Sequence, residues 1–350
     1  MRSDFLELPF DQFQRYKAAR DFADAVRPAP GESLKVLDVG GFPGLMVDWL
    51  PDDDVTVVDV IEAEAPNYVR ASGAELPFED ASFDLVCTCD TLEHVPAGER
   101  DAFLRELARV SKDYLFMTAP FADERTRMAE EILYGYVERV LKTDFVTLRE
   151  HLDNGLPNLD ATLAGLGETG FSTHDFPSGY LYHWLPMMVA KHHLMAHRDT
   201  DELHRRVDRF YNLNFSPDDH LEPSYRRVIV GSKAGAEAVK AFAGDRTAPA
   251  GSADGGSATA DNAKLEFFRL LTGLLDQDLK RDVSKLVDEL RGSTNQELAE
   301  AKAALAERDR QIADLRSVVQ AQNESIDELH ALVSRVRNFW PYRFFKRFRD

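Results

Sequence analysis

The chain has 350 residues, which is long for one ordinary domain, and its formal net charge is −19 with a sequence pI near 5.0. Because a general nucleic-acid binder needs a basic surface for phosphate contacts, this charge argues against that class of protein. The two cysteines, Cys87 and Cys89, exclude a disulfide framework and indicate a reducing compartment, with buried thiols favoured over a C-x-C metal site.

The first residues, MRSDFLELPFDQ, lack the basic and apolar regions of a secretion signal. Nowhere do about 18 apolar residues run together. We therefore expect a cytoplasmic protein that does not span a membrane.

Residues 1–33 contain LPFDQFQRYKAARDFADAV, which predicts a helix that caps the domain that follows. Over residues 34–240, β-rich runs alternate with helical patterns; the runs are LKVLDV, VTVVDV, FDLVCTC, DYLFMTAP, FSTHDF and YRRVIVGS. Strands that alternate with helices indicate βαβ units and a sheet covered on both faces. We predict an α/β fold with a doubly wound, mostly parallel, seven-stranded Rossmann-like sheet.

The stretch KVLDVGGFPG places a glycine turn after the first strand. Asp38 ends the strand, Gly40 and Gly41 allow a tight turn, and Gly44 lets the next helix begin close to the sheet. Backbone amides then lie at the carboxyl end of the first strand, the usual ligand crevice of open α/β sheets. Further along, Asp59 ends the second strand, where a carboxylate can accept both ribose hydroxyls of a nucleoside.

The order of VLDVGGFPG, VVDV and GAELPFEDASFDLVCTCDTLEHVP resembles the class I methyltransferases that use S-adenosylmethionine (SAM). The resemblance covers Lys35 to Pro120 and extends by sheet order to Lys233. It implies that the glycine turn borders the methionine part of SAM, that Asp59 binds the ribose and that the SGAELPF turn lies against adenine. The expected cofactor-binding residues are Asp38, Gly40, Gly41, Gly44, Asp59, Ser72, Gly73 and Asp90.

Two residues depart from the family pattern. Phe42 replaces the middle glycine of D-x-G-x-G-x-G, and Ser72 replaces the common aspartate that accepts from the adenine amino group. We expect the Phe42 side chain to turn away from the ligand, with Gly41 relieving the turn, and the Ser72 hydroxyl to serve as acceptor. SAM binding should survive both changes.

The fourth strand ends in CDTLEHVP, which places Asp90, Glu93 and His94 beside the expected methyl donor. In O-methylation an alcohol loses its proton as the methyl moves, so His94, or else Glu93, is the candidate general base. The D-x-x-E-H spacing is also similar to quinone-precursor O-methyltransferases, which implies Mg²⁺ bound by Asp90, Glu93 and His94 as an alternative. A third interpretation is structural, with these residues capping the next helix and bonding the loop.

An insertion at residues 121–170 is too long for an ordinary connection and predicts a lid over the acceptor pocket. Its candidate lining residues are Glu130, Tyr134, Tyr136 and His151. By analogy with the family, Phe10, Gln14 and Tyr16 of the N-terminal helix are expected to contact SAM.

The C-terminal third falls into four predicted segments. Residues 241–263 have the composition of a flexible linker, and residues 264–292 have the periodicity of an amphipathic helix. Residues 293–337 carry a heptad seam that predicts a coiled coil, with a single surface helix as the alternative. The seam positions are Leu298, Leu305, Ile312, Val319, Ile326 and Val333, with Ala301, Leu315, Leu329 and Val336 as companions.

Residues 338–350 combine basic and aromatic side chains in a chain that is otherwise acidic. This composition favours the headgroup layer of an anionic membrane, with a partner protein or single-stranded nucleic acid as alternatives.

Together these patterns predict a SAM-dependent methyltransferase that self-associates and lies peripherally at an inner membrane face. Methyltransferase, coiled coil and basic aromatic tail together are similar to enzymes of surface-polysaccharide biosynthesis, which implies O-methylation of a sugar hydroxyl on a membrane-linked glycan. The alternatives are a small-molecule O-methyltransferase with a quinone-like or phenolic acceptor, and a catalytically inactive coiled-coil scaffold.

Overall fold

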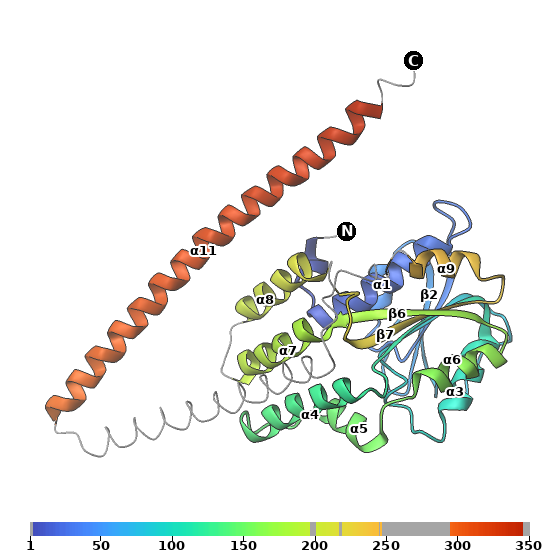
Figure 1. The fold of residues 1–350 in the computed structure, drawn as a ribbon, viewed down its shortest axis with the longest axis horizontal. Coiled ribbons are helices and arrows are strands. Elements are labelled where there is room, and N and C mark those ends of the chain that lie inside the picture. The colour runs from blue at the N-terminus through green and yellow to red at the C-terminus, as the bar shows by residue number, and fades with distance from the viewer. Residues whose placement is uncertain (1–2, 197–200, 217–218, 245, 247–294, 346–350) are drawn as a thin grey trace. The chain divides into compact units, whose positions relative to one another are not determined.

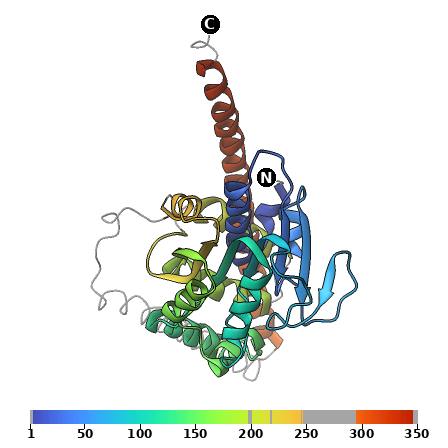
Figure 2. The ribbon, with the colours of Figure 1, turned by 90° about the vertical axis from the view of Figure 1, so that its right-hand side faces the viewer.

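The computed structural model describes residues 3–196, 201–216, 219–244, 246 and 295–345. The chain divides into two compact units, Met1–Asp276 and Gln277–Asp350. The first unit is built on one seven-stranded sheet with helices on both faces (Figure 1, Figure 2).

The sheet has the order β3-β2-β1-β4-β5-β7-β6, in which β7 runs antiparallel to both neighbours and the other paired strands are parallel. The strands are β1 (Lys35–Val39), β2 (Asp54–Asp59), β3 (Tyr68–Arg70), β4 (Phe83–Cys89), β5 (Ser111–Ala119), β6 (Ser172–Tyr180) and β7 (Ser224–Ser232). This confirms the mostly parallel, seven-stranded, Rossmann-like sheet predicted from the sequence. The short strand β3 was not among the predicted runs.

Central strands are buried on both faces, which explains their continuous apolar sequences. In β1 every residue after Lys35 is buried, and in β4 only Asp84 is not. Cys87 and Cys89 are buried free thiols in β4, as expected. A strand buried on both faces can present polar side chains to a ligand only where it ends, so the site must lie at a sheet edge.

Two helical layers cover the sheet. On one face α1 (Phe10–Val26), α2 (Leu45–Trp49) and α9 (Glu237–Gly244) pack into a core with Val36, Leu85 and Val230. On the other, α3 (Arg100–Val110) and α6 (Leu159–Glu168) pack against the alternate residues Leu37, Val86 and Ile229. The domain therefore extends through α9, past the predicted boundary at residue 240.

A third apolar core lies among α1, α4 (Glu124–Arg139), α5 (Val146–Asn154), α7 (Leu181–Ala196) and α8 (Asp201–Asn214). The predicted lid at residues 121–170 therefore needs a correction. Only α4 and α5 take part in this added layer, because Leu166 of α6 is buried in the core beneath the sheet.

The second unit contains α11 (Asn295–Phe345), a single helix of 51 residues. At 1.5 Å per residue it is roughly 76 Å long. It covers nearly all of the predicted coiled-coil segment and continues into the segment predicted as a tail. The predicted helix at residues 264–292 lies outside the described residues, as does most of the linker at 241–263. Among the described helices, none is long and apolar enough to cross a bilayer.

Candidate active site

The turn after β1 needs glycine at the positions that the sequence indicated. Gly40 has φ +75°, and a Cβ there would lie 2.3 Å from Thr91 Oγ1. At Gly41 a Cβ would lie 2.2 Å from Asp38 Oδ2. Gly44 has φ +97° at the start of α2. Side chains at these positions would strain the turn or fill the space above it, so the backbone itself forms this part of the site.

Asp38 lies under this turn and is completely buried. Within the described structure, neither of its carboxylate oxygens has a hydrogen-bond partner. Burial raises the pKa of Asp38 to about 7; the charge of Asp59 adds to the rise and Arg15 opposes it. A buried, unpartnered carboxyl group is costly, and a cationic or hydrogen-bonding ligand above the turn would relieve that cost.

Phe42 lies within the turn, and it is one of the residues that line the cavity beside the turn. The ring packs edge-on against Tyr68 with centroids 6.4 Å apart and is 43 % exposed. Its backbone N–H donates to Asp59 Oδ2 at 3.1 Å, and the Ile61 N–H donates to Asp59 Oδ1 at 3.1 Å. Asp59 is thus oriented by two amides at the end of β2, with lone pairs left for a diol.

A cavity of about 660 Å³ opens beside this turn, and we call it the donor cavity. Its volume lies in the range of small-molecule and cofactor sites. The predicted cofactor residues that line it are Gly40, Asp59, Ser72, Gly73 and Asp90. Asp38, Gly41 and Gly44 do not line it and instead shape the turn. At Gly73, any Cβ would lie 2.4 Å from the Phe103 ring, so the wall here also needs glycine.

Asp90, just after β4, lies between the donor cavity and a second cavity. Its Oδ2 accepts from Arg15 Nη1 at 2.6 Å and from Arg226 Nη2 at 2.9 Å, while its Oδ1 accepts from Thr118 Oγ1 at 2.8 Å. Burial alone would raise the pKa of Asp90, but Arg226, Arg15 and Thr118 lower it below its usual value. Asp90 is therefore ionised and fixed in place.

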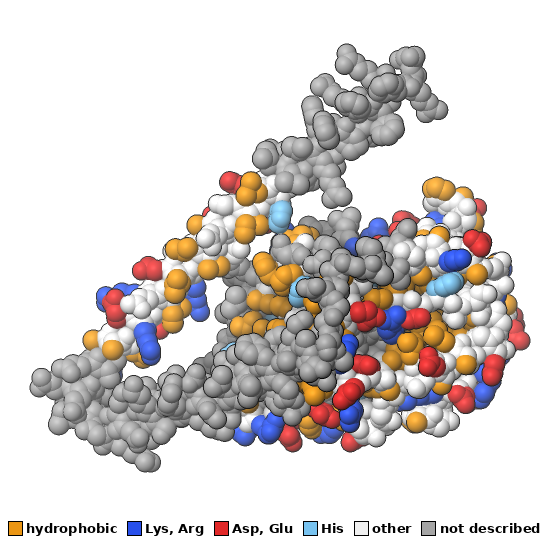
Figure 3. All heavy atoms as spheres, viewed as in Figure 1, with side chains coloured by type: hydrophobic (Ala, Val, Ile, Leu, Met, Phe, Trp, Pro, Cys, Tyr) orange, Lys and Arg blue, Asp and Glu red, His pale blue; other side chains and the backbone are white. Residues whose placement is uncertain are grey.

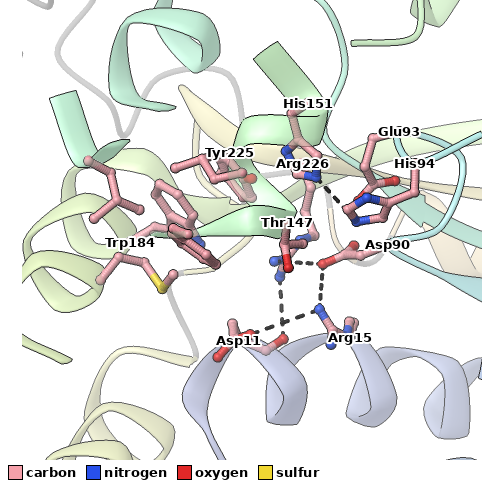
Figure 4. Close-up of a pocket in the computed structure, with 14 residues that line it drawn as sticks. Asp11, Arg15, Asp90, Glu93, His94, Thr147, His151, Trp184, Tyr225 and Arg226 are labelled. Atoms are coloured by element: carbon pink, nitrogen blue, oxygen red, sulfur yellow. Dashed lines mark hydrogen bonds and ion pairs between the residues drawn. The ribbon is translucent and has the colours of Figure 1, made fainter. Parts of the chain in front are cut away.

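The second cavity has a volume of about 250 Å³, and we call it the acceptor cavity (Figure 4). Asp90, His94 and Thr147 line both cavities. The other walls of the acceptor cavity bring together α1, α4, α5, α7 and β7; the labelled lining residues are Asp11, Arg15, Glu93, His151, Trp184, Tyr225 and Arg226. Two molecules, one bound in each cavity, would meet at the edge of the sheet near His94.

Two histidines and two glutamates form a row of close polar contacts beside this junction. His94 Nδ1 is 2.9 Å from Glu150 Oε2, His94 Nε2 is 3.3 Å from His151 Nε2, and His151 Nδ1 is 2.8 Å from Glu130 Oε1. Burial and His151 lower the pKa of His94 below 6.5, and Glu150 opposes that shift. His94 is therefore neutral at pH 7, as a general base must be.

Glu93 is buried at the end of the acceptor cavity, and its Oε2 has no hydrogen-bond partner among the described residues. Burial and the charge of Asp90 raise the pKa of Glu93 well above 4.5. This shift favours the protonated form of Glu93, which makes His94 the better base of the two.

The predicted metal trio of Asp90, Glu93 and His94 is corrected by this geometry. Both oxygens of Asp90 are already bonded to guanidinium and hydroxyl donors, so they do not face a cation. The groups that gather are Glu93, His94 and His151.

The sequence analysis missed some residues of the acceptor cavity and predicted the wrong position for others. Phe10 and Tyr16, expected to contact the cofactor, are buried in the apolar cores instead. Gln14 is also buried, where it donates to the Tyr211 hydroxyl and accepts from Arg226. The same helix presents Asp11 and Arg15 to the acceptor cavity. Of the predicted lid residues, His151 lines the cavity. Glu130 does not line it, but its carboxylate contacts the Nδ1 atom of His151. Tyr136 bonds His193, and Tyr134 packs in the third core.

Comparison with known proteins agrees with the donor half of this site. Residues 37–114 match the family described as a methyltransferase domain. An uncharacterized methyltransferase of Mycobacterium avium is 35% identical over 89 residues, which are 21% of this chain and 35% of that protein. An uncharacterized methyltransferase of Mycolicibacterium gilvum is 38% identical over 76 residues, which are 18% of this chain and 30% of that protein.

Solved structures are similar at lower identity. The YcgJ protein of Bacillus subtilis is 16% identical with a TM-score of 0.38, covering 62% of this chain and 98% of that one. Magnesium protoporphyrin IX methyltransferase of Synechocystis with bound SAM is 15% identical with a TM-score of 0.36, covering 64% and 84%. The chain spans about a third of the length of the curated relatives. Residues 37–114 are therefore similar to a methyltransferase domain, and this match carries no information on the acceptor.

Proposed function

We propose that this chain is a SAM-dependent methyltransferase that transfers the methyl group to a hydroxyl oxygen. The observation that carries this proposal is the pair of cavities that share Asp90, His94 and Thr147. The donor cavity joins a glycine turn to a ribose-binding carboxylate, and the acceptor cavity adjoins it at the carboxyl edge of the sheet. Such adjacency is what in-line transfer between two bound molecules requires.

In this arrangement catalysis comes mainly from proximity and orientation. SAM, when bound in the donor cavity, would supply an activated methyl group to the acceptor oxygen, and a neutral His94 would take the hydroxyl proton. Arg15 and Arg226 hold Asp90 in place and complete the wall around the reacting groups.

Calorimetric titration of the full chain with SAM and with its demethylated product tests the donor site. We expect Asp59→Ala to weaken binding by about 100-fold, because two hydrogen bonds to a charged acceptor are lost. Glu62→Ala is the matched control, since Glu62 is exposed, pairs only with Arg70 in the described structure and does not line the cavity. If the wild type binds neither compound, the inactive scaffold becomes the better account.

For the acceptor we propose a sugar hydroxyl of a membrane-linked glycan. The support is the basic aromatic composition of residues 338–350, which suits an enzyme working beside a lipid surface. Transfer of radiolabelled methyl from SAM into a lipid-linked glycan fraction would test it.

A small phenolic or quinone-like acceptor is the second candidate. It is favoured by the limited volume of the acceptor cavity and by Phe145, Trp184 and Tyr225 in its walls. Label incorporated into a panel of phenols, and not into glycan, would select this alternative.

We propose that the chain self-associates through α11. Seam residues of this helix, among them Leu305, Ile312, Val319 and Ile326, are 43 to 58 % exposed, and apolar side chains run along the helix in Figure 3. Exposed apolar residues at seven-residue spacing are the signature of a helix that pairs with copies of itself. Neighbouring valines give a matched test: Val319→Ser, in the seam, should lower the oligomer mass seen by analytical ultracentrifugation, and Val318→Ser, outside it, should not.

We also propose a peripheral position at the inner membrane face, through residues 338–350. Deleting residues 339–350 should reduce co-sedimentation with anionic vesicles and leave SAM binding unchanged. Unchanged co-sedimentation would refute the membrane contact, and recovery of a protein partner instead would point to the alternative. Nucleic acid is not expected to bind, given the overall charge.

A further inference from the structure

His94 and His151 come from different elements and point their Nε2 atoms at each other across 3.3 Å (Figure 4). His94 follows β4, and His151 lies on α5, fifty-seven residues further along the chain. Their rings are tilted by 53° with centroids 4.7 Å apart, so this is not a stacked pair. The contact is made edge to edge by the nitrogens.

The other nitrogen of each ring faces a carboxylate. His94 Nδ1 is 2.9 Å from Glu150 and His151 Nδ1 is 2.8 Å from Glu130. A carboxylate oxygen accepts a hydrogen bond from an imidazole N–H, and the tautomer that donates from Nδ1 leaves a lone pair on Nε2 of each ring. Two lone pairs facing each other repel unless a cation lies between them.

The separation of the two nitrogens fits such a cation. With zinc–nitrogen bonds of about 2.0 to 2.1 Å and tetrahedral angles, two imidazole ligands lie roughly 3.3 to 3.4 Å apart. Carboxylates behind ligating histidines are the usual outer partners, since they fix the tautomer and orient the ring. Glu130 is itself fixed by the Tyr225 hydroxyl at 2.9 Å.

Glu93 supplies the third group. Its side chain is 1 % exposed, its Oε2 has no partner in the described structure, and it lines the acceptor cavity. One ligand atom each from Glu93, His94 and His151 lie within 4.8 Å of one another. Closing this set onto one ion needs a shift of about 1.5 Å, which a side-chain rotation supplies.

We propose that Glu93, His94 and His151 bind a divalent transition-metal ion of the zinc type, with its open coordination position facing the acceptor cavity. Two imidazoles and one carboxylate are the ligands of catalytic zinc sites that keep a position free. Mg²⁺ prefers oxygen ligands, so this set selects against it. The site depends on α5, because His151 comes from the added layer.

The role of the ion rests on the proposed function, whereas its binding does not. An acceptor hydroxyl bound at the open position would lose its proton more readily, because the cation stabilises the alkoxide. His94 would then serve as a ligand, and the proton would leave to solvent. Metal-loaded protein should therefore methylate at lower pH than metal-free protein.

Binding of the metal alone is the direct test. The full chain is freed of metal with a chelator and titrated with Zn²⁺ against a chromogenic competitor, and with Co²⁺ followed by its visible absorption. We expect one high-affinity equivalent and a tetrahedral Co²⁺ spectrum. His151→Ala and Glu93→Gln should each weaken Zn²⁺ binding by more than about 100-fold, and Glu150→Gln by about 10-fold, as is usual for an outer partner.

His174→Ala is the matched control, because His174 lies on β6 and lines neither cavity. SAM binding is measured on the same samples to show that each variant is folded. Because His151 does not line the donor cavity, its loss should not change SAM binding, so the metal site and the proposed function are tested separately. Equal Zn²⁺ affinity in wild type and His151→Ala, or no binding by a wild type that binds SAM, overturns the metal site. Zn²⁺ binding without SAM binding would keep the metal site and refute the proposed function.

Discussion

The donor and acceptor cavities meet at Asp90 but are built in different ways. All but two of the donor-cavity residues lie within one stretch, Val39 to Phe103, at the ends of strands and in glycine turns. The acceptor cavity draws its walls from residue 11 to residue 226 and from at least five helices and strands. One is formed largely by the backbone of neighbouring turns, the other by side chains that meet only in the folded protein.

The two kinds of wall differ in how readily substitutions can change them. A cavity made of backbone tolerates few substitutions, because a Cβ at Gly40, Gly41 or Gly73 would fall within 2.4 Å of another atom. A cavity made of side chains on an added layer can change its shape and charge while the sheet stays the same. The family match covers residues 37–114 and therefore includes none of the helices α1, α4, α5 and α7 that wall the acceptor cavity.

The largest effect should come from removing the charge that joins the two cavities. Asp90→Asn removes the carboxylate paired with the buried Arg226 and leaves Arg15 only the more distant Asp11 at 3.9 Å, so the free energy of unfolding should fall by about 3 kcal/mol. Asp80→Asn removes the partner of Arg109 from a site where Asp80 is 79 % exposed, and should cost less than about 1 kcal/mol. Urea unfolding measures both. Equal effects would show that buried charge does not hold the acceptor side together.

Asp38 provides a pH test of the donor side. Its pKa in the folded protein is about 7, above the unfolded value near 3.8, so folded Asp38 keeps its proton when the unfolded chain has lost it. Asp38 therefore makes its full contribution to the free energy of unfolding below about pH 4, and that contribution is lost as the pH rises to 7. Asp38→Asn avoids that loss, so its free energy of unfolding should gain up to about 4 kcal/mol over wild type as the pH rises from 4 to 8.

Thermal or urea unfolding across that pH range, without ligand, makes the comparison. The same variant should bind SAM more weakly, since the unpartnered carboxylate is then gone from beneath the turn. A stability difference that does not change with pH would mean that Asp38 is ionised and paired in solution.

Of the eight predicted cofactor residues, five line the donor cavity, and the sequence could place them for a physical reason. Asp38 and Asp59 end apolar strands, and parallel strands bring their carboxyl ends to one edge, so local pattern places them together. Gly40 and Gly44 were recognised because only glycine readily takes positive φ. Glu93 and His94 followed from the end of β4 in the same way.

The acceptor half had no such local signal. Arg15 and Arg226 are 211 residues apart and meet at Asp90 only in the folded protein. Helical periodicity predicted α1 but did not tell which face would meet the cavity, so Phe10, Gln14 and Tyr16 were placed there instead of Asp11 and Arg15. One clue was present: Arg226 stands next to the apolar run of β7, where a buried arginine needs a carboxylate partner.

Gly40→Val tests whether backbone space forms the donor cavity. The substitution adds left-handed strain of about 1 to 2 kcal/mol and a clash with Thr91, so SAM affinity should fall by about 100-fold. Gly167→Ala is the control, because a Cβ there meets no atom within 4 Å. SAM affinity is measured by calorimetry on folded samples. A decrease in affinity of less than tenfold would mean that the turn rearranges at little cost.

The smallest effect should come from the residue that departs most from the family pattern. Phe42→Ala removes a ring that is 43 % exposed and packs edge-on against Tyr68, while keeping the backbone N–H that orients Asp59. SAM affinity should change by less than about threefold, below 1 kcal/mol. Tyr68→Phe, which loses the hydroxyl bond to the Ile61 carbonyl but keeps the ring contact, is the matched variant. If Phe42→Ala weakens SAM by tenfold or more, the ring contacts the cofactor, and the donor cavity depends on side chains as the acceptor cavity does.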